Sequence, residues 1–169
     1  MNINLHQASD IQCESALASG KADVAFCALP IDTEVFTVHV MKQLPVYFLI
    51  STDNPLSVCN KIHVSQLQDE QFITIDEDNK CGEGVNTRCQ KAGFVPNIIM
   101  RSSDTQLIYN LCQKNAGISF YIGEPASMPE EVTLIPEDPP NVWEVGPVTL
   151  TYRKPSKEAK EFIDFFKQW

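Results

Sequence analysis

The sequence has no surplus of basic residues, no long apolar run and no low-complexity tract. Its 169 residues hold 13 Lys and Arg against 22 Asp and Glu, a formal net charge of -9. Phosphate contacts need clustered Lys and Arg, so this balance excludes a free-standing nucleic-acid binder built on a basic face. The longest apolar runs, such as Val46 to Ile50, are far too short to span a bilayer. No signal peptide is visible at the N-terminus, and we therefore expect a cytoplasmic protein.

Metal-binding and catalytic patterns are missing as well. The six cysteines show no CxxC pair, and the three histidines are scattered, so neither a zinc site nor a Ser-His-Asp set is indicated. The acidic run at 76–79 departs from the EF-hand calcium pattern, because Lys80 stands where a ligand is needed. We expect no metal, no cofactor and mostly reduced thiols. The cysteines are Cys13, Cys27, Cys59, Cys81, Cys89 and Cys112.

What the sequence does contain is an alternation of helical and extended patterns. Helices are predicted after Ser9, near 64–69, over about 82–91, after about 104 and over 156–169. Strands are predicted at 3–5, 23–29, 34–41, 46–50, 72–75, 98–100, 118–122, 132–135 and 142–152. The alternation predicts an α/β fold.

The first predicted unit has the clearest pattern. Ser9 and Gln12 form a capping-box pattern that opens a helix. The apolar run at 23–29 is uninterrupted, which is typical of a parallel strand covered on both faces. With the alternation at 3–5, these elements predict a right-handed βαβ unit.

Several local signatures follow one another along the chain: LASGKADVAF at 17–26, VSQL at 64–67, AGFVP at 92–96, SDTQL at 103–107, NAGI at 115–118 and the last helix at 156–169. In this order they resemble the effector-binding domain of LysR-type transcriptional regulators. The resemblance covers essentially the whole chain. It implies an α/β, two-lobed type 2 periplasmic-binding-protein-like fold with mixed sheets.

The resemblance also implies a division of the chain. Lobe one would comprise residues 1–44 plus 142–169, lobe two residues 45–141, and the ligand cleft would lie between them. The family's helix-turn-helix is absent, and the first βα unit of lobe one is apparently missing. DNA would be bound only through a separate N-terminal domain, and the full-length protein would be a homodimer or tetramer.

Candidate ligand-binding residues cluster at predicted strand ends. Ser102, Ser103 and Thr105 open a helix, where hydroxyls and backbone N–H groups can bind a carboxylate. Plain helix capping by Ser103 or Asp104 is the alternative. Arg101 could neutralise an acidic effector, or it could form a surface salt bridge.

The remaining candidates would face the same cleft. They are Thr74 and Asp76 on the neighbouring strand, Ala28, Leu29 and Pro30 at the lobe-one strand end, and Tyr121 near the hinge. Asp76 fits a turn residue equally well, and an aromatic in a strand, such as Tyr121, is usually core.

One cysteine pair carries a further hypothesis. Peroxide-sensing members of the family have a reactive and a resolving cysteine in the region of Cys81 and Cys89, at nearly the same separation. Cys81 is expected in a loop and Cys89 on the helix that follows. However, Glu83 and the other acidic neighbours disfavour a thiolate.

The function implied by the resemblance is ligand sensing without catalysis. A small-molecule effector, such as an organic anion, would bind in the cleft and signal to the absent DNA-binding domain. The alternatives are an enzyme on the same scaffold, such as a prephenate dehydratase-like lyase whose threonine motif is not found here, and a solute-binding module. A cysteine-based peroxide sensor is a minor alternative.

Overall fold

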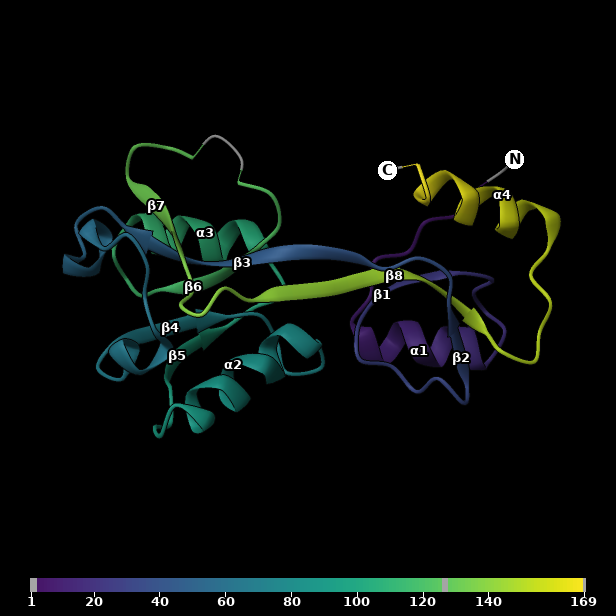
Figure 1. Ribbon diagram of the computed structural model, residues 1–169, viewed down its shortest axis with the longest axis horizontal. Helices are drawn as coiled ribbons and strands as arrows, with labels where there is room; N and C mark the ends of the chain where they lie inside the picture. The colour runs from purple at the N-terminus through teal and green to yellow at the C-terminus, as the bar shows by residue number, and fades with distance from the viewer. Residues whose placement is uncertain (1–2, 126–127, 169) are drawn as a thin grey trace. The chain divides into compact units, whose positions relative to one another are not determined.

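The computed structural model describes residues 3–125 and 128–168 (Figure 1). Its helices are α1 (Asp10–Ala18), α2 (Lys80–Lys91), α3 (Thr105–Gln113) and α4 (Lys157–Phe166), with short 3-10 helices at Pro55–Val58 and Val64–Leu67. Its strands are β1 (Ala25–Ala28), β2 (Phe36–Val38), β3 (Lys42–Ser51), β4 (Gln71–Thr74), β5 (Asn97–Arg101), β6 (Ser119–Ile122), β7 (Val132–Pro136) and β8 (Val142–Leu150). None of the described helices is both long and apolar enough to cross a membrane.

The chain divides into two compact units. Unit one is Met1–Gln43 with Trp143–Trp169, and unit two is Leu44–Val142. In unit one, β8 pairs antiparallel with both β1 and β2. The buried core between this sheet and α1 consists of Leu17, Ala25, Cys27, Phe36 and Val148. As predicted, the side chain of Ser9 accepts from the Gln12 backbone N–H and the Gln12 side chain accepts from the Ser9 N–H.

The predicted βαβ unit is wrong. Residues 3–8 form no strand, and Leu5 is 87% exposed. β1 pairs antiparallel with β8 instead of lying in a parallel sheet. The apolar run that suggested a parallel strand has another cause, since the outward ring of Phe26 lies 5.1 Å from the ring of Phe166 on α4. An aromatic contact with a helix from the other end of the chain thus explains the missing alternation.

The strands of unit two belong to two sheets, one with β3, β6 and β7 and one with β4 and β5, and helices lie on both sides of them (Figure 1). β3 pairs antiparallel with β6 and β7, and β4 pairs in parallel with β5. A parallel bridge between Phe72 and Ile118 joins β4 to the start of β6. On β3, Phe48 and Ile50 pack into one core cluster with α2, whereas Leu49 packs into a second cluster with α3. This two-residue alternation places the two helices on opposite faces.

Three details of unit two differ from the sequence predictions. The strand predicted at 46–50 begins earlier, because β3 starts at Lys42 and runs through Pro45, whose carbonyl oxygen accepts from the Gly123 N–H at 3.0 Å. The strand predicted at 98–100 is longer, since β5 covers Asn97–Arg101, and it is only partly buried, with Ile99 46% exposed. α2 begins at Lys80, two residues earlier than predicted.

The predicted end of the last helix at Trp169 lies outside the described residues. In unit one, α4 itself ends at Phe166.

Candidate functional site

The parallel strands β4 and β5 end side by side in unit two. Thr74 and Arg101 are register partners at these ends. The Ser102 N–H donates to the Thr74 carbonyl oxygen at 3.0 Å, and Thr74 is 4% exposed. The structure therefore brings together three of the predicted site residues. They lie at the carboxyl end of a parallel strand pair, where ligands of open α/β sheets are bound.

The N-terminus of α3 is already occupied by a carboxylate of the chain itself. Asp104 accepts from the backbone N–H groups of Gln106 and Leu107, at 3.0 and 3.1 Å. The Ser102 hydroxyl accepts from the Asp104 N–H at 3.0 Å and keeps its own proton to donate. Capping by Asp104, one of the two alternatives, is thus confirmed. Because that carboxylate repels a second anion, the helix end is a poor anion site.

Ser103 and Thr105 are exposed at this corner. Their hydroxyls lie before the first turn of α3 and at its first residue, respectively. With the helix dipole satisfied by Asp104, their contribution to a ligand would be hydrogen bonds alone.

Arg101 supplies the positive charge at the carboxyl ends of β4 and β5. Its Nη2 pairs with Oε1 of Glu77 at 2.5 Å, and the side chains are 30% and 58% exposed, respectively. The same Glu77 oxygen accepts from Nδ2 of Asn86 on α2 at 3.1 Å. The Nη1 of Arg101 is covered and has no hydrogen-bond partner among the described residues. The salt-bridge alternative is therefore present, but it uses only part of the guanidinium group.

Asp76 is a turn residue, as its alternative interpretation predicted. Its backbone carbonyl oxygen accepts from the Asn79 N–H at 3.1 Å, immediately before α2. Tyr121 is anchored within unit two: its hydroxyl donates to the Glu124 carbonyl oxygen at 3.0 Å, and its ring centroid lies 6.4 Å from that of Tyr47. A role for Tyr121 toward a hinge stays a prediction.

The lobe-one candidates Ala28, Leu29 and Pro30 belong to unit one. The Ala28 N–H donates to Oδ1 of Asp10 at 3.2 Å, and the Leu29 N–H donates to the Glu144 carbonyl oxygen at 2.8 Å. These bonds hold the end of β1 between α1 and β8. Ligand binding by this segment stays a prediction.

The cysteine pair has a geometry that disfavours a disulfide. Cys81 lies in the first turn of α2 rather than in a loop, and Cys89 lies on the same helix. Eight helical positions separate the two residues by about 12 Å along the axis. A disulfide needs Cα atoms within about 7 Å. Burial raises the pKa of the Cys89 thiol to about 11, which Glu137 reinforces and Arg88 opposes.

We expect mild peroxide to leave Cys81 and Cys89 unlinked. All six cysteines lie in the described part of the chain, and none of them forms a disulfide there. Burial also raises the pKa of Cys112 to about 12, so neither it nor Cys89 should react with iodoacetamide at pH 8 before unfolding. Peptide mass spectrometry with and without urea measures both outcomes. A linked Cys81–Cys89 peptide from folded protein would contradict this expectation.

Sequence reasoning missed two carboxylates. Glu137 follows the predicted strand at 132–135 in a stretch rich in proline and acidic residues, where a surface charge would be expected, but it is 7% exposed, and its Oε2 lies 3.2 Å from Nη1 of Arg88. The Arg88 guanidinium also lies over the Phe120 ring, 5.0 Å from its centroid. Glu77 belongs to the acidic run at 76–79, in which a solvated loop carboxylate would be expected. No local pattern signals either role, because each partner lies far away in the sequence.

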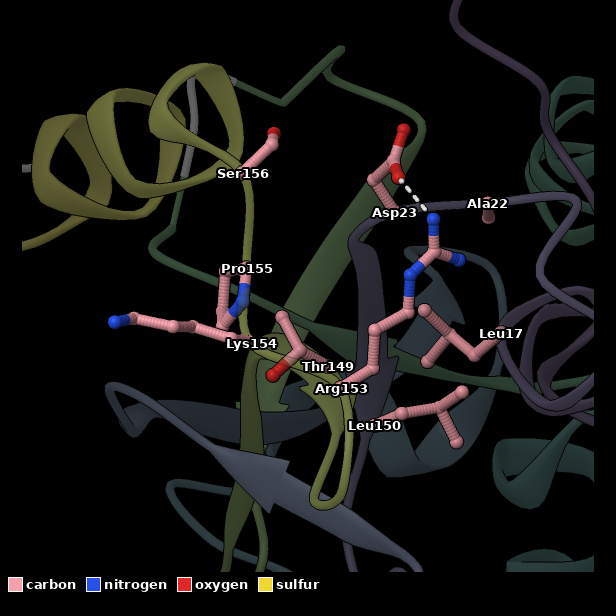
Figure 2. Close-up of a pocket in the computed structure, with 9 residues that line it drawn as sticks. All are labelled: Leu17, Ala22, Asp23, Thr149, Leu150, Arg153, Lys154, Pro155 and Ser156. Atoms are coloured by element: carbon pink, nitrogen blue, oxygen red, sulfur yellow. Dashed lines mark ion pairs between the residues drawn. The ribbon is translucent and has the colours of Figure 1, made fainter.

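Unit one contains a hollow of about 100 Å³, drawn in Figure 2. It is lined by Leu17, Ala22, Asp23, Thr149, Leu150, Arg153, Lys154, Pro155 and Ser156. Asp23 pairs with Arg153 across it at 3.6 Å, and the Thr149 hydroxyl is bonded to Nε2 of His39 at 2.7 Å. Ligand pockets usually enclose about 300–1,000 Å³, so this hollow is small for an organic effector. None of the predicted ligand-binding residues lines it.

In the described part of the chain, no three His, Cys, Asp or Glu residues gather into a group that could hold a metal ion.

Comparisons with known proteins agree on one family. The family model of the LysR substrate binding domain matches residues 1–169. An uncharacterized HTH-type transcriptional regulator of Bacillus subtilis, YwbI, is 24% identical over 100% of this chain and 57% of its own length. A hydrogen peroxide-inducible genes activator of Haemophilus influenzae is 22% identical over 71% of this chain and 40% of its own. The effector binding domain of QuiR in complex with shikimate superimposes with a TM-score of 0.82 at 16% identity, covering 94% of this chain and 77% of that one.

Proposed function

The chain belongs to the family of LysR substrate-binding domains, and we propose that it senses a small organic anion at the carboxyl ends of β4 and β5. Its mixed α/β fold is the periplasmic-binding-protein-like fold of that family. The chain spans 57% of the length of the Bacillus subtilis relative. We therefore also propose, rather than conclude, that it acts within a complete transcriptional regulator.

One observation carries the proposal. Arg101 brings a guanidinium group to the end of β5, where its backbone pairs with the buried Thr74 and the hydroxyl-bearing Ser102 follows it. A carboxylate can accept from the guanidinium and from a neighbouring hydroxyl at once. The structure of QuiR with shikimate supports this class of ligand, because shikimate is a hydroxylated carboxylic acid. A chain of net charge -9 repels an anionic ligand, so such a ligand needs a local positive charge, and Arg101 supplies one.

We further propose how binding would be used. The two curated relatives are named as a transcriptional regulator and a genes activator, and this chain would perform no catalysis. An effector that binds one conformation more tightly than another shifts the population toward it. A separate N-terminal domain would then carry this change to DNA in a homodimer or tetramer. Ala28, Leu29 and Pro30 stay predicted contributors from lobe one.

A thermal-shift screen of small organic acids tests the proposal. An acid at 100 times its Kd should raise the free energy of unfolding by about 2.7 kcal/mol. Ser102→Ala removes a hydroxyl donor and should weaken binding of that acid by about 1 kcal/mol. Ser57→Ala is the matched control, because its hydroxyl donates to the Thr52 carbonyl oxygen at 3.0 Å, away from β4 and β5. The proposal fails if no acid stabilises the chain, or if both variants bind alike.

A further inference from the structure

Glu77 ties together three elements around the candidate site. It follows β4, its carboxylate pairs with Arg101 at the end of β5, and the same oxygen accepts from Asn86 on α2. Its side chain is nevertheless 58% exposed. An ion pair with one partner so exposed contributes little to stability, and it can therefore exchange with another anion at low cost.

The contact also leaves the guanidinium only partly used. Nη2 of Arg101 forms an ion pair with the Glu77 carboxylate. Nη1 is buried and has no hydrogen-bond partner among the described residues. A guanidinium group presents its N–H donors as a planar fork that matches both oxygens of a carboxylate or phosphate. A bidentate anion would satisfy more of these donors than the single Glu77 oxygen does.

We propose that Glu77 is a built-in competitor for an anionic effector: it occupies Arg101 in the ligand-free chain and is displaced when the anion binds. This rests on the proposed function, since it requires an effector at the end of β5. Displacement has a second consequence. It moves the Glu77 oxygen away from Asn86 and so removes one of the contacts between the loop at 75–79 and α2. The competitor thus sets the affinity and links occupancy to a contact of that helix.

Isothermal titration of wild type and variants with shikimate, malate and inorganic phosphate tests this competition. Glu77→Gln removes the competing charge and should tighten binding roughly 2- to 5-fold, the range of an exposed ion pair. Arg101→Gln should weaken binding about 10- to 100-fold. In the double variant the Glu77 substitution should have no further effect, because the two residues act on one contact.

Two further variants separate competition from its alternatives. Asp78→Asn removes the same charge from the same loop, but Asp78 contacts Asn79 rather than Arg101, and binding should stay within about twofold of wild type. Arg101→Lys keeps the charge and loses the fork, so its affinity should fall between wild type and Arg101→Gln. Melting curves establish that each variant is folded, which excludes unfolding as the cause of lost binding.

The titrations distinguish the role of Glu77 as a competitor from the proposed binding of an organic anion. If none of the three probes binds wild type or any variant, both the proposed function and the role of Glu77 are overturned. If wild type binds a probe, but Glu77→Gln behaves like Asp78→Asn or Arg101→Gln has no effect, only the role of Glu77 is overturned. Tighter binding by Glu77→Gln alone, lost in the Arg101→Gln background, supports it.

Discussion

Replacing Arg88 by methionine is expected to lower the free energy of unfolding by about 3–5 kcal/mol, the cost of leaving a buried charge without its partner. The side chains of Arg88 and Glu137 are only 16% and 8% exposed. Methionine retains the apolar contact with the Phe120 ring but leaves the Glu137 carboxylate uncompensated. Urea denaturation of the two proteins measures the difference.

The double variant Arg88→Met with Glu137→Leu should recover most of that loss. A buried ion pair replaced by apolar side chains of similar size is often neutral or stabilising. Here, burial lowers the pKa of Arg88 and raises the pKa of Glu137, so desolvation outweighs the attraction between the two charges. The contact from Nη1 to Oε2, although 3.2 Å long, also lacks hydrogen-bond geometry. A double variant as unstable as the sum of the two single variants would refute this account.

The penalty of Arg88→Met should depend on pH. Burial raises the pKa of Glu137 above its ordinary 4.5, against the opposing effects of Arg88 and His63. A carboxyl group with a raised pKa binds its proton more tightly in the folded state, so its contribution to stability falls as pH rises from 4.5 through the folded value. Removing Arg88 raises that folded value further. The two proteins should therefore differ more in stability at pH 7 than at pH 4.5, and a gap that widens on acidification would contradict the assignment.

Gly82→Ala is expected to destabilise unit two by about 2–3 kcal/mol, the upper range for overpacking. Within a helix, alanine is ordinarily more stable than glycine by about 0.5–1 kcal/mol. Here the sign reverses, because the added Cβ would stand 2.4 Å from the Asp76 carbonyl oxygen and 2.6 Å from that of Ile75. Both contacts are with backbone, which cannot rotate away. The variant should also lose ligand binding, since the displaced segment connects Thr74 to Glu77.

Gly93→Ala is the control for this substitution. Gly93 follows the same helix with φ of 94° and has open space around its Cβ position. Its replacement adds backbone strain of about 1–2 kcal/mol without a steric clash, and it lies away from the loop after β4. Equilibrium melts and probe titrations of the two variants compare them directly. A Gly82→Ala protein as stable as wild type would show that α2 does not press against this loop.

Helix caps and the glycines that follow helices could be predicted from the sequence, because they depend on interactions between residues close together in the chain. The capping box of Ser9 and Gln12 and the caps at Asp104 and Ser156 depend on hydrogen bonds between residues two or three apart. The positive φ of Gly20 and Gly93 follows from the helix ends that precede them. The LysR family and the α/β class also followed from such short signatures in their order along the chain.

The candidate site was only partly predictable. The meeting of Thr74, Arg101 and Ser102 could be predicted because strand ends are visible in the sequence and parallel strands end together, while their role toward a ligand stays a prediction. The Glu77 partner of Arg101 was missed, because a loop carboxylate is usually solvated and no spacing rule connects it to a strand end. The sequence thus predicts which strand ends lie together, but it does not predict which carboxylate pairs with Arg101.

The sequence by itself determined the helix caps at Ser9, Asp104 and Ser156, most of the extended segments, and the family to which the chain belongs, since each of these depends on neighbours within a few residues. Tertiary structure alone decided that β1 runs antiparallel to β8, that Glu137 is buried against Arg88, and that Glu77 occupies Arg101. The reason is one of distance along the chain. Strand direction and charge burial are set by partners that only folding brings into contact.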